Sequence, residues 1–326
     1  MADMIWLKKI YRIFRDIYWM IFQRRADKKW FRDHVEKVNT EENPTYYVIR
    51  RINKVGLFSY VQTTLGQIVY ALEHNMIPIV DMKNYPNTYL EEDEIGVKNA
   101  WELFFKQICD KDLDEVLANG RYILSEDTNI DLRFTPRLNG VYQKRAYWFW
   151  SEMYRKYVIF SEPVKEYCEK EYDSILKNKA EKTLGVLVRG TDYKYAKGHA
   201  IQPTVETVID KVKDVLEKDK SFQYIYLATD EFKTEQEFQK AFPGKIIINK
   251  RTYFDGYDFS KTLIGDIVLE RENDKYLRGL EYLSSLNLLS KCGGLCSGLS
   301  GGTFAAFYMN HGKYRYKYFW DLGNAK

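Results

Sequence analysis

Three short segments combine charged and small residues directly after apolar runs of strand length. An arginine at a strand end can grip a phosphate through its planar fork of N–H groups. A carboxylate after another strand can accept hydrogen bonds from a ribose or a base edge, or it can cap the next helix. Small residues that open a helix expose backbone N–H groups to an anion. The segments are Arg189-Gly190-Thr191-Asp192-Tyr193, Ala228-Thr229-Asp230-Glu231 and Ser297-Gly298-Leu299-Ser300-Gly301-Gly302-Thr303.

The elements around these segments alternate between strand and helix. Apolar runs predict strands at Leu184–Val188, Phe222–Ala228, Ile246–Ile248 and Gly294–Cys296. Helical spacing follows at Thr204–Leu216, Thr234–Phe242, Tyr276–Lys291 and Ser300–Met309. This order predicts an α/β fold with a parallel sheet covered on both faces, whose ligand lies at the carboxyl ends of the strands. Three motifs at one such edge favour a nucleotide diphosphate as the ligand. The chain has no G-x-x-x-x-G-K-[ST] or G-x-G-x-x-G motif, which disfavours P-loop ATP hydrolysis and dinucleotide dehydrogenases.

The first half of the chain predicts a second parallel unit. Strands at Tyr46–Ile49 and Ile77–Val80 flank a helix at 61–74, which suits a βαβ crossover. Gly56 precedes that helix and either brings backbone amides near a ligand or simply makes a turn. The polar and aromatic stretch 83–101 either lines an acceptor site or is a surface excursion.

The basic charge of the protein is concentrated at its N-terminus. The first 30 residues hold eight Lys and Arg against three Asp, whereas the remainder holds 42 basic against 43 acidic residues. On a helical wheel, residues 5–22 (IWLKKIYRIFRDIYWMIF) place basic side chains opposite a Trp, Phe and Ile face. This pattern favours a helix in a membrane interface, and a helix packed on the body is the alternative. The body itself does not have the charge of a nucleic-acid binder.

Length and composition exclude several other classes. The chain has 326 residues, 45% hydrophobic, so intrinsic disorder is excluded and two domains are allowed. The four cysteines lie at 109, 168, 292 and 296, without a Cys-x-x-Cys pair, and predict reduced thiols of a cytoplasmic protein and no zinc site. Signal-peptide and membrane-spanning patterns are not visible. We therefore expect a cytoplasmic location, peripheral on the inner face of the membrane.

Three motifs resemble those of a known enzyme family. Val186–Asp192 is similar to the H-x-R-x-[ST]-D motif of fucosyltransferases related to the nodulation and core α1,6 enzymes and the protein O-fucosyltransferases. Tyr226–Glu231 resembles their second motif, an apolar strand that ends in A-T-D-[DE], and Leu280–Thr303 resembles the third. The resemblance is best over 184–309 and fainter over 46–81, where it points to bacterial capsule-type members. Leu187 replaces the motif histidine, and Gly190 replaces a second motif arginine.

The resemblance implies a GT-B glycosyltransferase in which two Rossmann-like domains face a cleft. Accordingly, we expect a basic amphipathic helical segment at 1–43, an acceptor domain at 44–180 and a nucleotide-sugar domain at 181–326. The implied reaction is inverting transfer of fucose from GDP-fucose, without a metal ion or cofactor, to a glycan or lipid-linked saccharide. A transferase that uses a different GDP- or UDP-sugar is an alternative.

Residues at the strand ends can be assigned expected roles in such a transfer. Arg189 matches the motif arginine that contacts the donor β-phosphate, where negative charge grows in the transition state. Asp192 and His199 are the candidates for the base that activates the acceptor hydroxyl. Gly56 and Ser59 are expected near donor and acceptor. The expected donor-binding residues are Gly190, Thr191, Lys197, Asp230, Glu231, Glu281, Ser297, Ser300, Gly301, Gly302 and Thr303.

Two readings from other classes stay open. The chain could be an inactive nucleotide-sugar-binding scaffold at the membrane surface, with Leu187 and Gly190 marking lost catalysis. It could also be a nucleotide-dependent enzyme of another chemistry, because a doubly wound fold does not fix function. A donor-hydrolysis assay separates the transferase from the scaffold, and a failure with every nucleotide sugar would favour the third reading.

Overall fold

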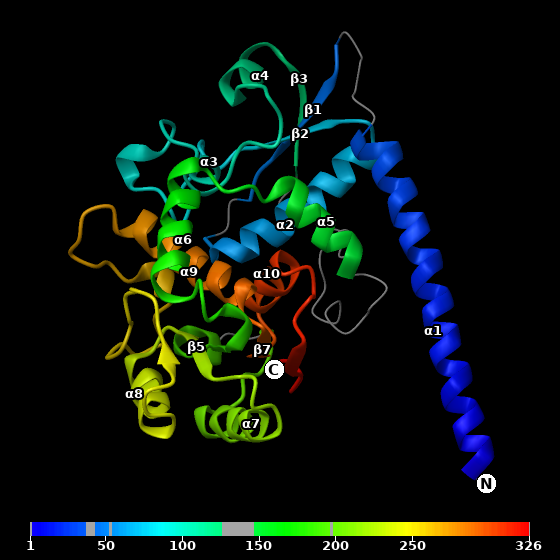
Figure 1. Ribbon diagram of the computed structural model, residues 1–326. Coiled ribbons are helices and arrows are strands. Elements are labelled where there is room, and N and C mark those ends of the chain that lie inside the picture. The colour runs from blue at the N-terminus through cyan, green and yellow to red at the C-terminus, as the bar shows by residue number, and fades with distance from the viewer. Residues whose placement is uncertain (1, 37–42, 52–53, 126–146, 196–197, 326) are drawn as a thin grey trace.

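The computed structural model describes residues 2–36, 43–51, 54–125, 147–195 and 198–325. Two parallel β-sheets lie in the two halves of the chain, and helices pack between and around them (Figure 1). The predicted α/β class with parallel sheets is therefore confirmed.

The first sheet has three parallel strands in the order β2-β1-β3. Its central strand is buried over four of five positions, which fits its β-branched and aromatic sequence TYYVI. Since all three strands run in one direction, their carboxyl ends meet at one edge, where Arg50, Asp81 and Ser125 follow. The strands are β1 (Thr45–Ile49), β2 (Ile77–Val80) and β3 (Arg121–Leu124).

The second sheet has five parallel strands in the order β6-β5-β4-β7-β8. Its central strand β4 is buried at every position, as expected of a strand covered on both faces. The carboxyl ends of β4, β5 and β7 lead directly into the three segments that carry the motifs. The strands are β4 (Thr183–Val188), β5 (Tyr224–Thr229), β6 (Ile246–Ile247), β7 (Gly294–Gly298) and β8 (Tyr316–Trp320).

Helices connect the strands and join the two halves. Helix α2 of the first half packs on α10 of the second, and α6 packs on α9. One continuous apolar core includes residues of both halves, and the stacked rings of Phe104 and Tyr276 lie across the junction. The α-helices are α1 (Ala2–Phe31), α2 (Leu57–Glu73), α3 (Ala100–Phe104), α4 (Leu113–Asn119), α5 (Tyr147–Tyr157), α6 (Glu162–Ile175), α7 (Val205–Lys218), α8 (Phe232–Ala241), α9 (Asp274–Lys291) and α10 (Gly301–Met309).

The N-terminal helix is longer than the sequence pattern predicts. It continues to Phe31 and is followed by a π-helical turn at Arg32–Glu36. Trp30 and Phe31 pack edge-on against Phe149 of α5, while the rest of α1 extends along the outside of the molecule (Figure 1). No helix among the described residues combines the length and apolar character that a membrane crossing requires.

Other parts of the fold differ from the predictions or were not predicted. Helix α2 begins at Leu57 instead of residue 61, because Leu57, Phe58 and Tyr60 are all buried. Strands β3 and β8 have no counterpart in the prediction. Every position of β3 is exposed, and β8 is the mixed aromatic and basic run YKYFW, so neither has the apolar pattern of a buried strand. The stretch 83–101 contains a 3₁₀ turn at Glu92–Glu94 and buries Tyr89 and Leu90 in the core.

Candidate functional site

Arg189 lies at the carboxyl end of β4 in a nearly closed environment. Its Nη1 lies 3.0 Å from Oδ2 of Asp230, at the end of the neighbouring strand. The guanidinium carbon lies 5.4 Å from the ring centroid of Tyr193 and 5.6 Å from that of Tyr282, within the range of cation–π attraction. Burial works to lower the pKa of Arg189, but Asp230 and the surrounding phenols outweigh it and raise that pKa. The guanidinium is thus a fixed, permanent positive charge.

Asp230 and Glu231 hold the loop that follows Arg189. The backbone N–H of Gly190 donates to Oδ1 of Asp230 at 2.9 Å, and the Thr191 hydroxyl donates to Oδ2 at 3.0 Å. The Thr191 N–H donates to Glu231 at 3.3 Å, and Thr191 has a φ of 49°. A Cβ atom on Gly190 would lie 2.1 Å from the Glu231 carboxyl carbon, so a larger residue here would have to displace the Glu231 side chain.

These contacts define the role that Asp230 has in the protein alone. It does not cap α8, because the N-cap position is Glu231. Instead, the N–H groups of Phe232 and Lys233 donate to the distant Asp255, at 2.7 and 3.1 Å. Asp230 is 2% exposed and orients Arg189 and its loop. The proposed contact of Asp230 with a nucleotide stays a prediction.

The small-residue segment after β7 leads into α10. Ser300 is the N-cap, and its hydroxyl accepts from the Thr303 N–H at 3.2 Å. The Ser297 and Thr303 hydroxyls lie 2.8 Å apart, which ties the strand end to the first helical turn. By helix geometry, the N–H groups of Gly301 and Gly302 have no acceptor within the helix. The start of α10 therefore offers two amides and the positive end of a helix dipole to an anion.

Tyr282 of α9 links Arg189 to the start of α10. Its ring faces the Arg189 guanidinium, and its hydroxyl would lie 2.5 Å from a Cβ atom on Gly302. Tyr193 makes a second link, because its hydroxyl donates to the Leu299 carbonyl at 3.4 Å. The arginine and the helix start therefore share neighbours at one edge of the sheet. No sequence pattern predicts the position of Tyr282, since nothing local distinguishes one tyrosine of a helix from another.

The two candidate bases differ in their contacts. Asp192 accepts from the Ile264 N–H at 3.1 Å and from the Thr191 hydroxyl at 3.3 Å. His199 is exposed, and its ring centroid lies 4.6 Å from that of Tyr193. Partial burial lowers the pKa of His199, and Arg189 adds to this effect while Asp192 opposes it. His199 is therefore neutral over a wider pH range than an ordinary histidine. Lys197 lies outside the described residues.

The carboxylate of Glu281 accepts hydrogen bonds from other residues of the protein. One bond comes from Nη1 of Arg271 at 2.7 Å, and another comes from the backbone N–H of Thr252 at 3.0 Å. Glu281 thereby fastens the loop after β6 to α9. The same loop carries Arg251, whose buried Nε has no partner within the described part of the chain. No motif accompanies Arg251, so its sequence context does not predict this position.

The first half contributes the N-terminal end of α2. Gly56 is its N-cap, with no side-chain cap, and Ser59 accepts from Nη1 of Arg51 at 2.9 Å. Phe58 packs edge-on against Tyr282, and its Cβ lies 3.6 Å from the position of a Cβ on Gly301. The start of α2 thus lies beside the start of α10. The contact of Gly56 and Ser59 with donor or acceptor stays a prediction.

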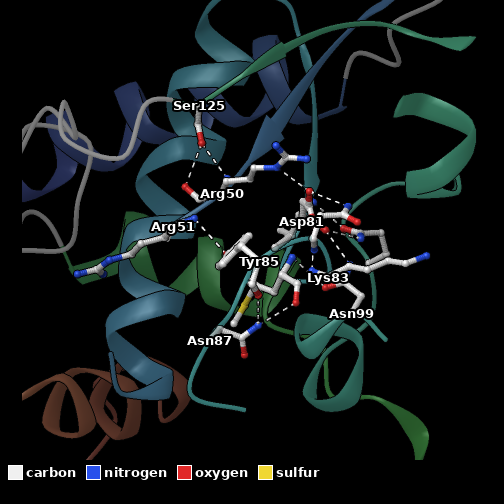
Figure 2. A network of polar contacts seen from close by, with 12 residues as sticks. Arg50, Arg51, Asp81, Lys83, Tyr85, Asn87, Asn99 and Ser125 are labelled. Carbon is white, nitrogen blue, oxygen red and sulfur yellow. Dashed lines mark hydrogen bonds and ion pairs between the residues drawn. The ribbon is translucent and has the colours of Figure 1, made fainter. Parts of the chain in front are cut away.

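The carboxyl edge of the first sheet holds a different polar network (Figure 2). Nε of Arg50 donates to Oδ2 of Asp81 at 2.6 Å, and Asp81 is fully buried. Asp81 also accepts from the N–H groups of Lys83 and Asn84 at 2.9 and 3.1 Å. Ser125 bridges the N–H and the carbonyl of Arg50 at 2.8 and 3.1 Å. These contacts fix the turns that leave the three strands.

Within the described ranges, no group of three or more His, Cys, Asp or Glu side chains is placed to hold a metal ion. The four cysteines are unpaired, and burial raises the pKa of Cys168 and Cys296 to about 12. Thiols with such pKa values are protonated at neutral pH and are poor nucleophiles.

Comparisons with known proteins identify the fold. No protein-family model and no curated protein matches the sequence. Among solved structures, fucosyltransferase NodZ from Bradyrhizobium is similar with a TM-score of 0.50 and 13% identity, over 81% of this chain and 93% of that one. A NodZ α-1,6-fucosyltransferase crystal soaked with GDP-fucose gives 0.47 and 15%, over 81% and 92%. POFUT1 in its apo form gives 0.45 and 11%, over 86% and 99%.

The likeness to NodZ extends over most of both chains, and at 13% identity it concerns the arrangement of the backbone. It agrees with the two parallel sheets of this chain. The fold expected from the motif resemblance is thereby confirmed: the chain has the GT-B fold of fucosyltransferase NodZ.

Proposed function

We propose that the protein is a glycosyltransferase that transfers fucose from GDP-fucose to a glycan or a lipid-linked saccharide. The observation that carries this proposal is the position of Arg189. Asp230, Tyr193 and Tyr282 hold it at the carboxyl end of β4, beside the Gly301–Gly302 start of α10. The fold shared with fucosyltransferase NodZ supports fucose as the transferred sugar.

The chemistry of the leaving group explains why this arrangement suits sugar transfer. As the glycosidic bond to the diphosphate breaks, the sugar becomes oxocarbenium-like and negative charge grows on the β-phosphate. Arg189 and the amides of Gly301 and Gly302 supply fixed positive charge and N–H donors to that phosphate. These groups need no reorganisation during the reaction, because Asp230 and the Ser300 cap already hold them. The transfer then proceeds without a metal ion.

His199 is the better candidate for the base. Its ring is exposed and its lowered pKa keeps it neutral, whereas Asp192 is occupied by the Ile264 N–H. In an inverting transfer, the base takes the proton of the acceptor hydroxyl as that oxygen attacks the anomeric carbon. Asp192 then positions the 264–266 turn and favours the imidazolium that forms. The acceptor enters from the side of α2, where Gly56 and Ser59 lie.

A donor-specificity assay tests this proposal. Full-length protein is incubated separately with GDP-fucose, GDP-mannose and UDP-sugars, with and without saccharide acceptors, and the release of free nucleoside diphosphate is measured. GDP release from GDP-fucose that falls at least about 100-fold in Arg189→Gln would support the assignment. Matched control Arg50→Gln removes an arginine from the other sheet edge and should keep the rate. Release from a different nucleotide sugar would reassign the donor, and binding without turnover would favour the inactive scaffold.

A further inference from the structure

Helix α1 has an exposed apolar face along the outside of the molecule. Six aromatic or aliphatic side chains between residues 11 and 22 are exposed, with exposures from 43% to 70%. At about 100° per residue they fall within one arc of roughly 140°. The residues of this apolar face are Tyr11, Phe14, Ile17, Tyr18, Ile21 and Phe22.

The opposite side of the same helix faces the body. Asp27 is 5% exposed, and Met20, Gln23 and Trp30 are partly covered. Trp30 donates to Glu73 of α2 at 2.9 Å and packs on Phe149 of α5. The body therefore holds α1 by its C-terminal turns, and the remainder of the helix extends along the outside of the molecule (Figure 1). A row of large apolar side chains that points into solvent marks a contact surface.

The charge on α1 identifies what this surface contacts. Arg24, Arg25, Lys28 and Lys29 are exposed on the same helix, and the first 30 residues carry eight basic against three acidic side chains. A second copy of the helix would bring these like charges together. An anionic lipid surface instead attracts them and also accepts the aromatic rings at the headgroup level.

We propose that α1 is a monotopic anchor that lies in the interface of an anionic bilayer, with its apolar face inserted among the acyl chains. The helix lies on the membrane and does not cross it. The anchor does not depend on the proposed sugar transfer, because its readout involves no donor. It would bring the candidate site at the end of β4 to a membrane surface, where a lipid-linked saccharide is available as acceptor.

Vesicle flotation of the full-length protein tests the anchor. The vesicles contain either phosphatidylcholine alone or phosphatidylglycerol and phosphatidylcholine in equal parts, at low and high salt. The wild type should float with the anionic vesicles and much less with the neutral ones, and salt should weaken binding. Combined Phe14→Ser, Ile17→Ser and Ile21→Ser should lower binding at least about tenfold. Combined Arg25→Gln, Lys28→Gln and Lys29→Gln should lower it about fivefold per removed charge.

A control variant separates this surface from any other exposed apolar position. Val97→Ser with Val268→Ser changes two side chains that are 68% and 85% exposed elsewhere, and it should float like the wild type. A wild type that fails to float with anionic vesicles would overturn the anchor. So would a serine variant of α1 that floats unchanged. A dimer that those serine substitutions convert to a monomer, without lipid binding, would assign the face to a second copy of the chain.

Discussion

The carboxyl edges of the two sheets carry the same pair of residue types in different surroundings. In each, an arginine follows one strand and a buried aspartate follows its neighbour, at 2.6 Å for Arg50–Asp81 and 3.0 Å for Arg189–Asp230. Asp81 also accepts hydrogen bonds from Lys83 and Asn84 of its own turn. Asp230 reaches across to the loop of the next strand, through Gly190 and Thr191.

The element after the third strand distinguishes the two edges. At the edge of the first sheet, the Ser125 hydroxyl is hydrogen-bonded to the backbone N–H and carbonyl of Arg50. At the second edge, two glycines open α10 beside Tyr282 and leave N–H groups available to an anion. An Arg–Asp pair at neighbouring strand ends therefore serves by itself only to stabilise the turns that follow the strands. It becomes a candidate phosphate site when a helix start with small residues lies next to it.

The largest expected effect concerns Asp81 at the carboxyl edge of the first sheet. Asp81→Ala removes a fully buried carboxylate and leaves the partly exposed Arg50 side chain and two turn amides without their acceptor. Removing one partner of a buried pair typically costs about 3–5 kcal/mol of folding free energy. Chemical denaturation should show this loss, while the folded fraction keeps its turnover number. A loss of turnover without a loss of stability would place Asp81 in the catalytic machinery and break the comparison.

The second effect concerns Arg189 at the carboxyl edge of the second sheet. Arg189→Gln should slow the turnover of GDP-fucose by about 100- to 1,000-fold, because one fixed donor to the developing phosphate charge is lost. Arg50→Gln, the matched substitution, should lower the melting temperature and leave the turnover number within about threefold. Equal turnover losses in the two variants would contradict the distinction between the edges.

A third prediction concerns the backbone after Arg189. In Gly190→Ala, the new methyl group meets the Glu231 side chain, which Thr191 and Thr234 already hold in place. We expect a loss of about 1–3 kcal/mol in folding free energy, together with weaker nucleotide binding. Gly265→Ala is the control, since its Cβ would meet only Thr88, at 3.7 Å, and it should change stability by less than about 0.5 kcal/mol. A fully stable and active Gly190→Ala protein would refute the tight packing of this loop.

The smallest effect concerns the titration of His199. Protonation of a base abolishes its function, so the transfer rate should fall as the pH drops through the pKa of His199, which lies below the usual 6.5. Asp192 raises that pKa, so Asp192→Asn should move the acid limb of the rate profile to lower pH, by less than about one pH unit. An acid limb that stays in place in His199→Gln would exclude His199 as the titrating base.

The sequence predicted the strand ends better than the contacts made there. Apolar runs bounded by polar residues located β4, β5 and β7, and thereby the positions of Arg189 and Ser300. The partners of Glu281 could not be predicted, because Arg271 and Thr252 approach it from a loop without a repeating pattern. The position of Tyr282 and the hydrogen bond between Asp230 and Gly190 depend on tertiary packing. Such contacts leave no pattern in the local sequence.

Nucleotide binding tests the central claim most directly. The melting of the wild type, Arg50→Gln and Arg189→Gln is followed with increasing GDP, each variant compared with its own ligand-free form. At a GDP concentration 100 times the Kd, the wild type and Arg50→Gln should gain about 2.7 kcal/mol of stability, and Arg189→Gln should gain far less. Equal stabilisation of all three proteins, or none in the wild type, would contradict a diphosphate site at the end of β4.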